Sequence, residues 1–568
     1  MTLVKPAIKI VAVFLFLEIV EDGHPFTRVY SLKLVLNNRM LEQFNGTNNL
    51  YKSYLLMSTP RSKSLTKRLF MELSLKILPS PQRLNRSLVA ALLTSSMLTT
   101  CWFPKPASAQ TTTYCRFTQQ EISEKENLLQ VALKGNQDTQ KRYKALLKQH
   151  AEYLRQCRSQ NWPNDQATWL RLYPCDSRPG AMDKLLDRIV NMGYNKVYVE
   201  VFGDSQVLLP AADNPTPWPS VVRAPGSEKV DLLAQIIEKG RERGVKVYAW
   251  MFSMNFGYTY ALRPDKDSVL ARNGKGQKAV LSFSDGMQVF IDPYNVQAKK
   301  DYYQLVQAFV KRRPDGILFD YIRYPRGQGT DSVVTKVQDL WIYGNSARQA
   351  LYSRALNYKG RVLIERFINN GVVTAGDIQA VDQLYPQEGS PLWQGRNPPP
   401  NEMLATPAQR QPLMQWELWQ LSVAHAVQGI LDFVNLAMQP AQKQGIKTGT
   451  VFFPEANQGV GQVGYDSRLQ PWERFSSSIE WHPMVYATCG NSNCIEEQVK
   501  RVLKRAPAGT KVEPVLAGMW GKSLSNRPSL EAQMQGIRQA TPQINSVSHF
   551  AFSWQDPTFD RDRKSCRL

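Results

Sequence analysis

Asp315-Gly-Ile-Leu-Phe-Asp-Tyr-Ile-Arg-Tyr-Pro325 is the stretch from which the fold of the chain can be worked out. Its apolar run, Gly316–Tyr321, has the length and composition of a buried β-strand and carries a single acid, Asp320. An amphipathic helix is predicted just before it, over Tyr302–Arg312. A helix that leads directly into a buried strand is typical of a parallel βαβ unit.

The same alternation of apolar runs and amphipathic helices repeats along the chain. It predicts parallel βαβ units, and eight units in succession favour a closed (β/α)8 TIM barrel over an open doubly wound sheet. We therefore assign residues 166–560 to an α/β barrel domain. The candidate strands are Thr168–Pro174, Lys196–Phe202, Val245–Phe252, Gly316–Tyr321, Lys447–Phe453, Ser478–Tyr486, Lys511–Met519 and Ser546–Trp554, and the helices include Met182–Met192, Val230–Arg243, Tyr302–Arg312, Trp416–Gln442 and Ile495–Arg505.

Two segments depart from this alternation. Residues 119–160 carry apolar stripes at helical spacing around Gly135-Asn136, which predicts a helical hairpin within the segment 110–165. Residues 326–412 form a long insertion after the fourth strand, with helical stretches at Ser332–Leu356 and Arg361–Asn370. Since the insertion leaves the C-terminal end of a barrel strand, it is either a lid over the substrate or a peripheral subdomain.

Residues 71–109 have the three parts of a secretory signal peptide. A positively charged start is followed by an uncharged apolar core, Leu88–Leu98, and by the cleavage site Ala107-Ser-Ala109. Met71 is expected to be the true start, which makes residues 1–70 an over-extended translation. A membrane anchor at Ile8–Val20 is the alternative, but it is short for a span. We expect an exported protein, periplasmic, in the cell envelope or extracellular, with no stable membrane span in the mature chain.

Six of the seven cysteines remain after removal of the signal peptide, an even number that fits disulfides in an oxidising compartment. Cys489 and Cys494 could close a small loop, and Cys115 and Cys157 could clip the helical hairpin. The pairing is not fixed by sequence alone. A zinc site is disfavoured because no second close Cys/His pair accompanies Cys489 and Cys494.

The formal net charge of +22 bears on the partners of the chain. A basic surface favours acidic partners, and a merely solvated basic surface is the plainer explanation. No Lys/Arg block is long enough for a nucleic-acid arm, so no nucleic acid is expected.

Gly459–Gly464 matches G-x-G-x-x-G, but no amphipathic helix begins there, so we expect no dinucleotide. We expect no cofactor and no metal, with a carboxylate-bound Ca²⁺ left open.

The strand ends supply the candidate site, because TIM barrels carry their chemistry at the C-terminal ends of the strands. The candidate catalytic residues are Asp320, Glu200 and Glu455. The competing interpretations are an Asp320–Arg323 ion pair, a satisfied core carboxylate for Glu200, a solvated loop residue for Glu455 and a core role for His482. The candidate substrate-binding residues are Trp250, Arg323, Tyr324, His482, Tyr486, Trp520 and Trp554.

Several carboxylates with Trp and Tyr at one barrel mouth fit glycoside hydrolysis. The reaction uses one protonated and one ionised carboxyl on either side of the bond, and aromatic rings stack on the apolar faces of sugars. We assign Asp320 as nucleophile or base, with Glu455 or Glu200 as the acid.

The motifs resemble the glycosyl-hydrolase-like 10 family of exported bacterial proteins over roughly residues 166–556. The resemblance rests on Asp292-Pro-Tyr-Asn followed by Asp315–Pro325, with weaker pieces at Met192–Val201, Arg243–Trp250, Pro471–Phe475, His482–Tyr486 and His549–Trp554. It implies a TIM-barrel glycoside hydrolase with the fourth-strand Asp in the site. The family often has two adjacent Asp where this chain has Asp320-Tyr321, and a Ser-Pro-Phe-Gly-like piece in place of Phe453-Pro-Glu-Ala. Glu455 therefore rests on its position alone.

The function expected from these features is hydrolysis of O-glycosidic bonds in a cell-wall or extracellular polysaccharide, with peptidoglycan or an acidic glycan as candidate substrates. Two alternatives stay open. One is a glycan-binding barrel without catalysis, in which Asp320 is structural. The other is a scaffold protein that acts through the helices of residues 119–160.

Overall fold

The computed structural model describes residues 16–19, 30–33, 114–203, 205–283 and 286–567. The chain divides into two units, Met1–Thr100 and Cys101–Leu568. In the first, β1 (Phe16–Ile19) pairs antiparallel with β2 (Tyr30–Lys33). The predicted signal peptide, its cleavage site and most of the extension 1–70 lie outside the described residues. All that follows concerns the second unit.

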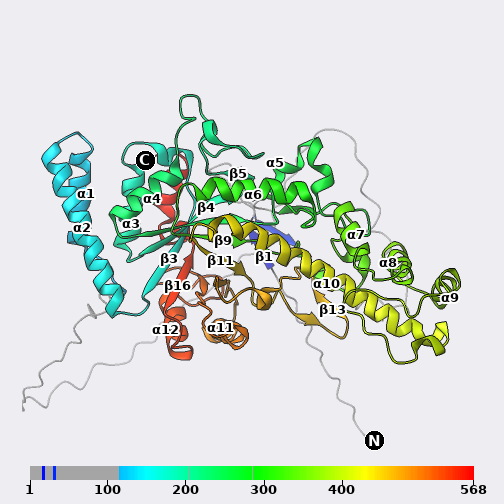
Figure 1. Ribbon diagram of the computed structural model, residues 1–568. Coiled ribbons are helices and arrows are strands. Elements are labelled where there is room, and N and C mark those ends of the chain that lie inside the picture. Colours follow the sequence, from blue (N-terminus) through cyan, green and yellow to red (C-terminus); the bar gives the residue numbers. More distant parts are fainter. Residues whose placement is uncertain (1–15, 20–29, 34–113, 204, 284–285, 568) are drawn as a thin grey trace, which may run out of the picture. The chain divides into compact units, whose positions relative to one another are not determined.

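Eight parallel strands form the centre of the second unit (Figure 1). They run in the order β3 (Asp165–Leu170), β4 (Lys196–Gly203), β6 (Lys246–Phe252), β9 (Gly316–Asp320), β11 (Lys447–Phe452), β14 (Glu480–Pro483), β15 (Val515–Ala517) and β16 (Ser546–Phe550). β16 returns to pair with β3. Parallel bridges from Trp481 to Val512 and from Met484 to Val515 join β14 to β15 and close the circle. The predicted TIM barrel is confirmed.

The last three strands are shorter than predicted. β14 ends at Pro483 and β15 begins after Pro514, since a proline has no N–H to donate to a sheet ladder. β16 ends at Phe550, and the residues expected to continue it form a short helix, α13 (Phe552–Gln555). The predicted position of Trp554 on a strand is therefore wrong, although the residue still lies above the strand end.

The helices pack around the barrel as the alternation predicts, with one gap. They are α3 (Ala181–Asn191), α4 (Leu232–Glu242), α6 (Val296–Val310), α10 (Pro407–Gln442), α11 (Asn493–Arg505), α12 (Leu530–Ala540) and α14 (Pro557–Lys564). Between β11 and β14 the fully described chain holds two short strands, β12 (Gly459–Val460) and β13 (Gly464–Asp466), and no α-helix. The connection after β6 adds a short helix, α5 (Tyr258–Ala261), and a hairpin, β7 (Val280–Phe283) with β8 (Gly286–Val289).

Helix α10 begins nine residues before its predicted start at Trp416. Thr406 caps it, and Pro407 occupies the first turn, where a missing N–H costs nothing. α10 is also the one described helix long and apolar enough to cross a membrane. Most of that apolar window, 61%, is buried inside the protein, as in the core helix of a folded domain.

The insertion after β9 is smaller in helical content than predicted. Of the stretch Ser332–Leu356, only α7 (Asn345–Tyr352) is α-helical; α8 (Tyr358–Asn370) and α9 (Ala375–Leu384) follow. Figure 1 shows these helices lying along α10. An ion pair between Arg410 of α10 and Asp382 of α9 joins the two helices.

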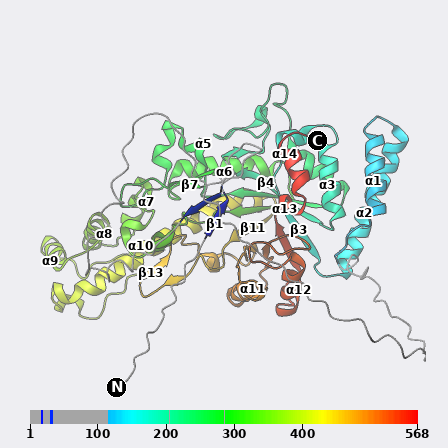
Figure 2. The ribbon, with the colours of Figure 1, turned by 180° about the vertical axis from the view of Figure 1, so that it is seen from behind.

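The N-terminal hairpin forms as predicted, from α1 (Gln119–Ala132) and α2 (Gln137–Gln160), with Gly135 at a positive φ of 90° in the turn. It lies beside α3, as both views show (Figure 2). Arg158 anchors its base, donating to the backbone oxygens of Tyr114, Pro163 and Gly193.

The described part of the chain holds three disulfides: Cys115–Cys157, Cys175–Cys566 and Cys489–Cys494. The first closes the hairpin and the third closes the small loop, as suggested by sequence. Three disulfides are typical of proteins in an oxidising compartment.

Candidate functional site

Asp320 ends β9 at the C-terminal mouth of the barrel, with only 6% of its surface exposed. Its Oδ2 accepts a hydrogen bond of 3.1 Å from Trp250 Nε1, and its Oδ1 accepts one of 2.6 Å from the Tyr321 backbone N–H. Burial raises the pKa of Asp320 to about 6, while these two donors and the charge of Arg323 limit the rise. A carboxyl with such a pKa carries its proton under mildly acidic conditions.

Arg323 does not form the ion pair with Asp320 that would make both residues structural. Its guanidinium lies 4.6 Å from the Tyr321 ring centroid, and Nη1 donates to Tyr324 O at 3.0 Å. Tyr324 is 1% exposed, with its hydroxyl 3.4 Å from Ala426 O on α10. In this structure Tyr324 packs against α10 and is not open to a substrate.

Glu200 lies two strands from Asp320, on β4. Its carboxylate forms an ion pair with Arg171 at 2.9 Å, just after β3. In the sheet register Glu200 pairs with Trp250, the residue that donates to Asp320. Neighbouring strands lie about 4.8 Å apart, so two strand steps place the two backbones about 10 Å apart. The strands that carry Glu200 and Asp320 therefore lie on the same side of the barrel mouth.

An aromatic pocket of about 150 Å³ lies beside these carboxyls; we call it the mouth pocket. Trp169 and Trp250 meet edge to face in its wall, with ring centroids 4.9 Å apart. Phe550 stands 6.2 Å from Trp250. The pocket is lined by Trp169, Leu170, Arg171, Tyr173, Trp250, Phe550, Ala551, Ser553, Trp554 and Asp560. It offers apolar ring faces with one cation and one carboxylate at the rim, a combination that suits a sugar ring.

The structure brings Tyr486 to this mouth but not Glu455 or Trp520. Burial and the charge of Asp320 raise the pKa of Tyr486 well above its usual range, and its ring is 6.1 Å from Phe550. Glu455 instead accepts a hydrogen bond from Gln498 on α11. Trp520 lies against the N-terminal segment, under the Arg116 guanidinium at 4.1 Å.

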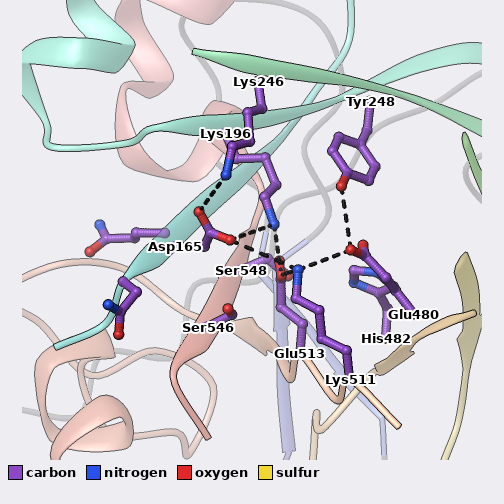
Figure 3. Close-up of polar contacts among 12 residues, drawn as sticks. Asp165, Lys196, Lys246, Tyr248, Glu480, His482, Lys511, Glu513, Ser546 and Ser548 are labelled. Atoms are coloured by element: carbon purple, nitrogen blue, oxygen red, sulfur yellow. Dashed lines mark hydrogen bonds and ion pairs between the residues drawn. The ribbon is translucent and has the colours of Figure 1, made fainter. Parts of the chain in front are cut away.

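His482 lies in a cluster of polar side chains that includes Lys196 and Glu480, the first residues of β4 and β14 (Figure 3). Its Nε2 is 3.5 Å from Glu480 Oε2, and its side chain is fully buried. Glu480 also pairs with Lys511 at 2.9 Å. His482, Lys511 and Lys196 overcome the burial of Glu480 and hold its pKa well below its usual range.

Lys196 and Glu513 form the centre of the same cluster, which we call the barrel-floor cluster (Asp165, Lys196, Tyr198, Tyr248, Glu480, His482, Lys511 and Glu513). Both side chains are 0% exposed and 2.9 Å apart, and Asp165 lies 3.3 Å from Lys196 (Figure 3). Burial disfavours the Lys196 ammonium, but Glu513 and Asp165 outweigh it and hold its pKa above its usual range. Because its carboxylates and ammonium groups pair with one another away from the mouth, we assign this cluster to stability.

The first part of the barrel also matches a known family. Residues 162–355 match the glycosyl hydrolase-like 10 family. None of the curated proteins matches the sequence. Asp320, Glu200, Arg171, Trp250 and Arg323 lie within the matched residues, whereas Glu455, Tyr486 and Trp554 lie beyond them.

Three glycosidases are among the solved structures that match the chain at low identity. The catalytic domain of β-amylase from Paenibacillus polymyxa is 12% identical, covering 68% of this chain and 92% of that one, with a TM-score of 0.39. A GH18 chitinase from Pseudoalteromonas aurantia is 11% identical over 71% and 98%, with a TM-score of 0.32. A GH20 exo-β-N-acetylglucosaminidase from Vibrio harveyi is 10% identical over 72% and 57%, with a TM-score of 0.36.

Sequence reasoning missed several residues of the mouth. Arg171 lies inside the first predicted strand, Thr168–Pro174, whereas β3 ends at Leu170, so its position just after a strand end is known only from the structure. Trp169 and Phe550 belong to apolar runs, and nothing in their sequence context distinguishes a mouth residue from a core residue. Among the described residues, no group of three or more His, Cys, Asp or Glu is placed to hold a metal ion.

Proposed function

We propose that this chain is an exported glycoside hydrolase that cleaves O-glycosidic bonds of a polysaccharide at the barrel mouth. The observation that carries the proposal is Asp320, a buried carboxyl whose pKa burial raises to about 6 at the edge of an aromatic pocket. Glycosidases combine one protonated and one ionised carboxyl in such a place. The family match over residues 162–355 and the three disulfides support hydrolysis and export respectively.

The pKa of Asp320 favours a different division of labour from the one expected by sequence. A carboxyl that holds a proton near pH 6 suits the general acid, which protonates the leaving oxygen. Glu200 is the partner that the geometry supports, because it lies two strands from Asp320 and its carboxylate pairs with Arg171 at 2.9 Å. Asp320 then donates the proton, and Glu200 acts as nucleophile or as the base that activates water. Glu455 has no part in this assignment.

The substrate we infer is a cell-wall or extracellular polysaccharide. Its sugar ring would stack in the mouth pocket, and the bond to be cleaved would lie above Trp250, between Asp320 and Glu200. The basic character of the chain makes acidic glycans such as peptidoglycan strands the first to test.

The test is release of reducing ends by the purified protein from peptidoglycan glycan strands, alginate, hyaluronan, chitin and cellulose. Asp320→Asn should lower the rate on the cleaved glycan by at least about a hundredfold, the typical contribution of a general acid. Glu200→Gln should do the same. Unchanged turnover in Asp320→Asn would contradict the assignment, and binding of a glycan without any cleavage would favour a non-catalytic barrel.

Asp292→Asn is the matched control. Asp292 is also buried, accepts two backbone hydrogen bonds of 2.9 Å, from Tyr294 and Ala347, and has a pKa raised by burial to about 6. It does not line the mouth pocket. If loss of a buried carboxylate were enough to inactivate the protein, both variants would lose activity; we expect the loss only for Asp320→Asn.

A further inference from the structure

A second and larger pocket opens on the same end of the barrel; we call it the outer pocket. Its volume is about 440 Å³, roughly three times that of the mouth pocket. One wall is the β7–β8 hairpin, through Val280 and Ser282. Another is the segment Pro325–Gln328, which begins five residues after Asp320. Nothing in the proposed chemistry uses this pocket.

Tyr321 lies between the outer pocket and the catalytic carboxyl. Its hydroxyl accepts a hydrogen bond of 3.3 Å from Gln288 on β8, and Gln288 pairs with Leu281, which lines the outer pocket. On the other side, the Tyr321 backbone N–H donates to Asp320, and its ring packs on Phe252 at 4.3 Å. The outer pocket and the mouth pocket therefore flank the Asp320-Tyr321 dipeptide. Gln288 links Tyr321 to the wall of the outer pocket, and Trp250 links Asp320 to the mouth pocket.

The lining of the outer pocket offers hydrogen-bonding groups of both kinds. Arg326 is exposed and has no ion pair among the described side chains, so its donors are available. Lys275 and Asp339 line the pocket as an ion pair at 2.8 Å, and amide groups come from Gln277 and Gln328. Sugar hydroxyls both donate and accept hydrogen bonds, so they match such a mixed surface better than an apolar ligand would. Trp341 adds a partly buried ring.

We propose that the outer pocket binds a segment of about three sugar units on the far side of the cleaved bond. The inference rests on the proposed function. If the mouth pocket holds one sugar unit, the threefold larger outer pocket has room for about three. A ligand that spans both pockets would pass over Asp320.

Ser282→Tyr tests the proposal by filling the outer pocket from an exposed position on β7, and Arg326→Ala removes its free cation. Oligosaccharides of two to eight units are prepared from the glycan of the panel that the wild-type protein cleaves. Calorimetry measures their binding to the Asp320→Asn protein, alone and combined with each change. Arg142→Ala, an exposed arginine on α2, is the matched control for loss of charge.

Affinity should rise with chain length up to about four units. Ser282→Tyr should weaken binding of the six-unit chain by about tenfold or more, a loss of about 1.4 kcal/mol per tenfold, with two-unit binding unchanged. Arg326→Ala should weaken it in the same direction, and Arg142→Ala should not. An affinity that is independent of length would overturn the outer-pocket proposal while leaving Asp320 as the acid. Full activity in Asp320→Asn would instead overturn the proposed function and this inference with it.

Discussion

Trp250 Nε1 lies 3.1 Å from Asp320 Oδ2 and donates a hydrogen bond to it. The same indole lines the mouth pocket, so one side chain contacts both the buried acid and the space next to it. A hydrogen bond to a carboxylate favours its ionised form. Trp250 therefore opposes the effect of burial on Asp320 and helps to keep its pKa near 6 instead of higher.

Trp250→Phe should move the pH profile of the enzyme. The ring remains in the pocket, but the donor is lost, so the pKa of Asp320 rises further. In the proposed mechanism the protonated acid is the active form, so the alkaline fall in kcat should shift to higher pH by about 0.5 to 1 unit. Trp554→Phe is the control, because Trp554 lines the same pocket and has no hydrogen bond to Asp320. A shift of equal size in both variants would show that pocket shape, and not the hydrogen bond, sets the profile.

Asp320→Asn should stabilise the protein at neutral pH while it inactivates it. The folded pKa of Asp320, about 6, lies above its usual value, so the stabilising contribution is present below about pH 4 and is lost as pH rises through 6. Above that pH the protein holds a buried charge, which Asn avoids. We expect the free energy of unfolding to increase by about 1 to 3 kcal/mol at pH 7 and to be nearly unchanged at pH 4. Urea denaturation at both pH values measures it.

The opposite sign would identify Asp320 as a structural residue. If Asp320 mainly anchored its neighbours, Asp320→Asn would leave unpaired donors and lower stability at pH 7. Loss of stability together with retained glycan cleavage would contradict the catalytic assignment.

The barrel and the acids on its strands were predictable because both depend on short-range pattern. Buried parallel strands are continuous apolar runs, so Gly316–Asp320 and Lys196–Gly203 stand out from the helices between them. Asp320 and Glu200 stand out because burying an unpaired carboxylate in such a run costs free energy, so its presence indicates a partner or a function. The limits of the strands were less predictable where proline shortened the pairing, at Pro483 and Pro514.

The partners of these residues could not be predicted, because they depend on contacts between distant parts of the chain. Arg171 pairs with Glu200 only once β3 and β4 are paired. Gln498 donates a hydrogen bond to Glu455 only once α11 packs beside the loop after β11. The insertion helices and the barrel-floor cluster likewise depend on tertiary packing. Lys196 looks like a solvated first residue of a strand, yet it is fully buried.

The Cys115–Cys157 disulfide should stabilise the helical hairpin more than Cys489–Cys494 stabilises its loop. The first spans 42 residues and the second 5. In the chain-entropy model the double Cys→Ser variants lose about 4 and about 2 kcal/mol of unfolding free energy respectively. Chemical denaturation of the two variants gives the comparison. Equal losses would show that strain or residual structure, and not loop length, determines the effect. Glycan cleavage should survive in both, since neither bond lines the mouth pocket.

Glu513→Gln should weaken the fold without touching the chemistry. Glu513 is fully buried between the Lys196 ammonium, at 2.9 Å, and the Tyr198 hydroxyl, so its removal leaves Lys196 with Asp165 as its one ion-pair partner among the described side chains. Breaking a buried pair in this way costs about 3 to 5 kcal/mol. Lys511→Met is the comparison: Lys511 belongs to the same cluster but is 36% exposed, and water screens its pairs, so the loss should stay below about 1 kcal/mol. Thermal unfolding reports both losses, and kcat measured well below the melting temperature should equal that of the wild type. A fall in kcat for Glu513→Gln under those conditions would show that the barrel-floor cluster influences the mouth, and its assignment to stability alone would then be wrong.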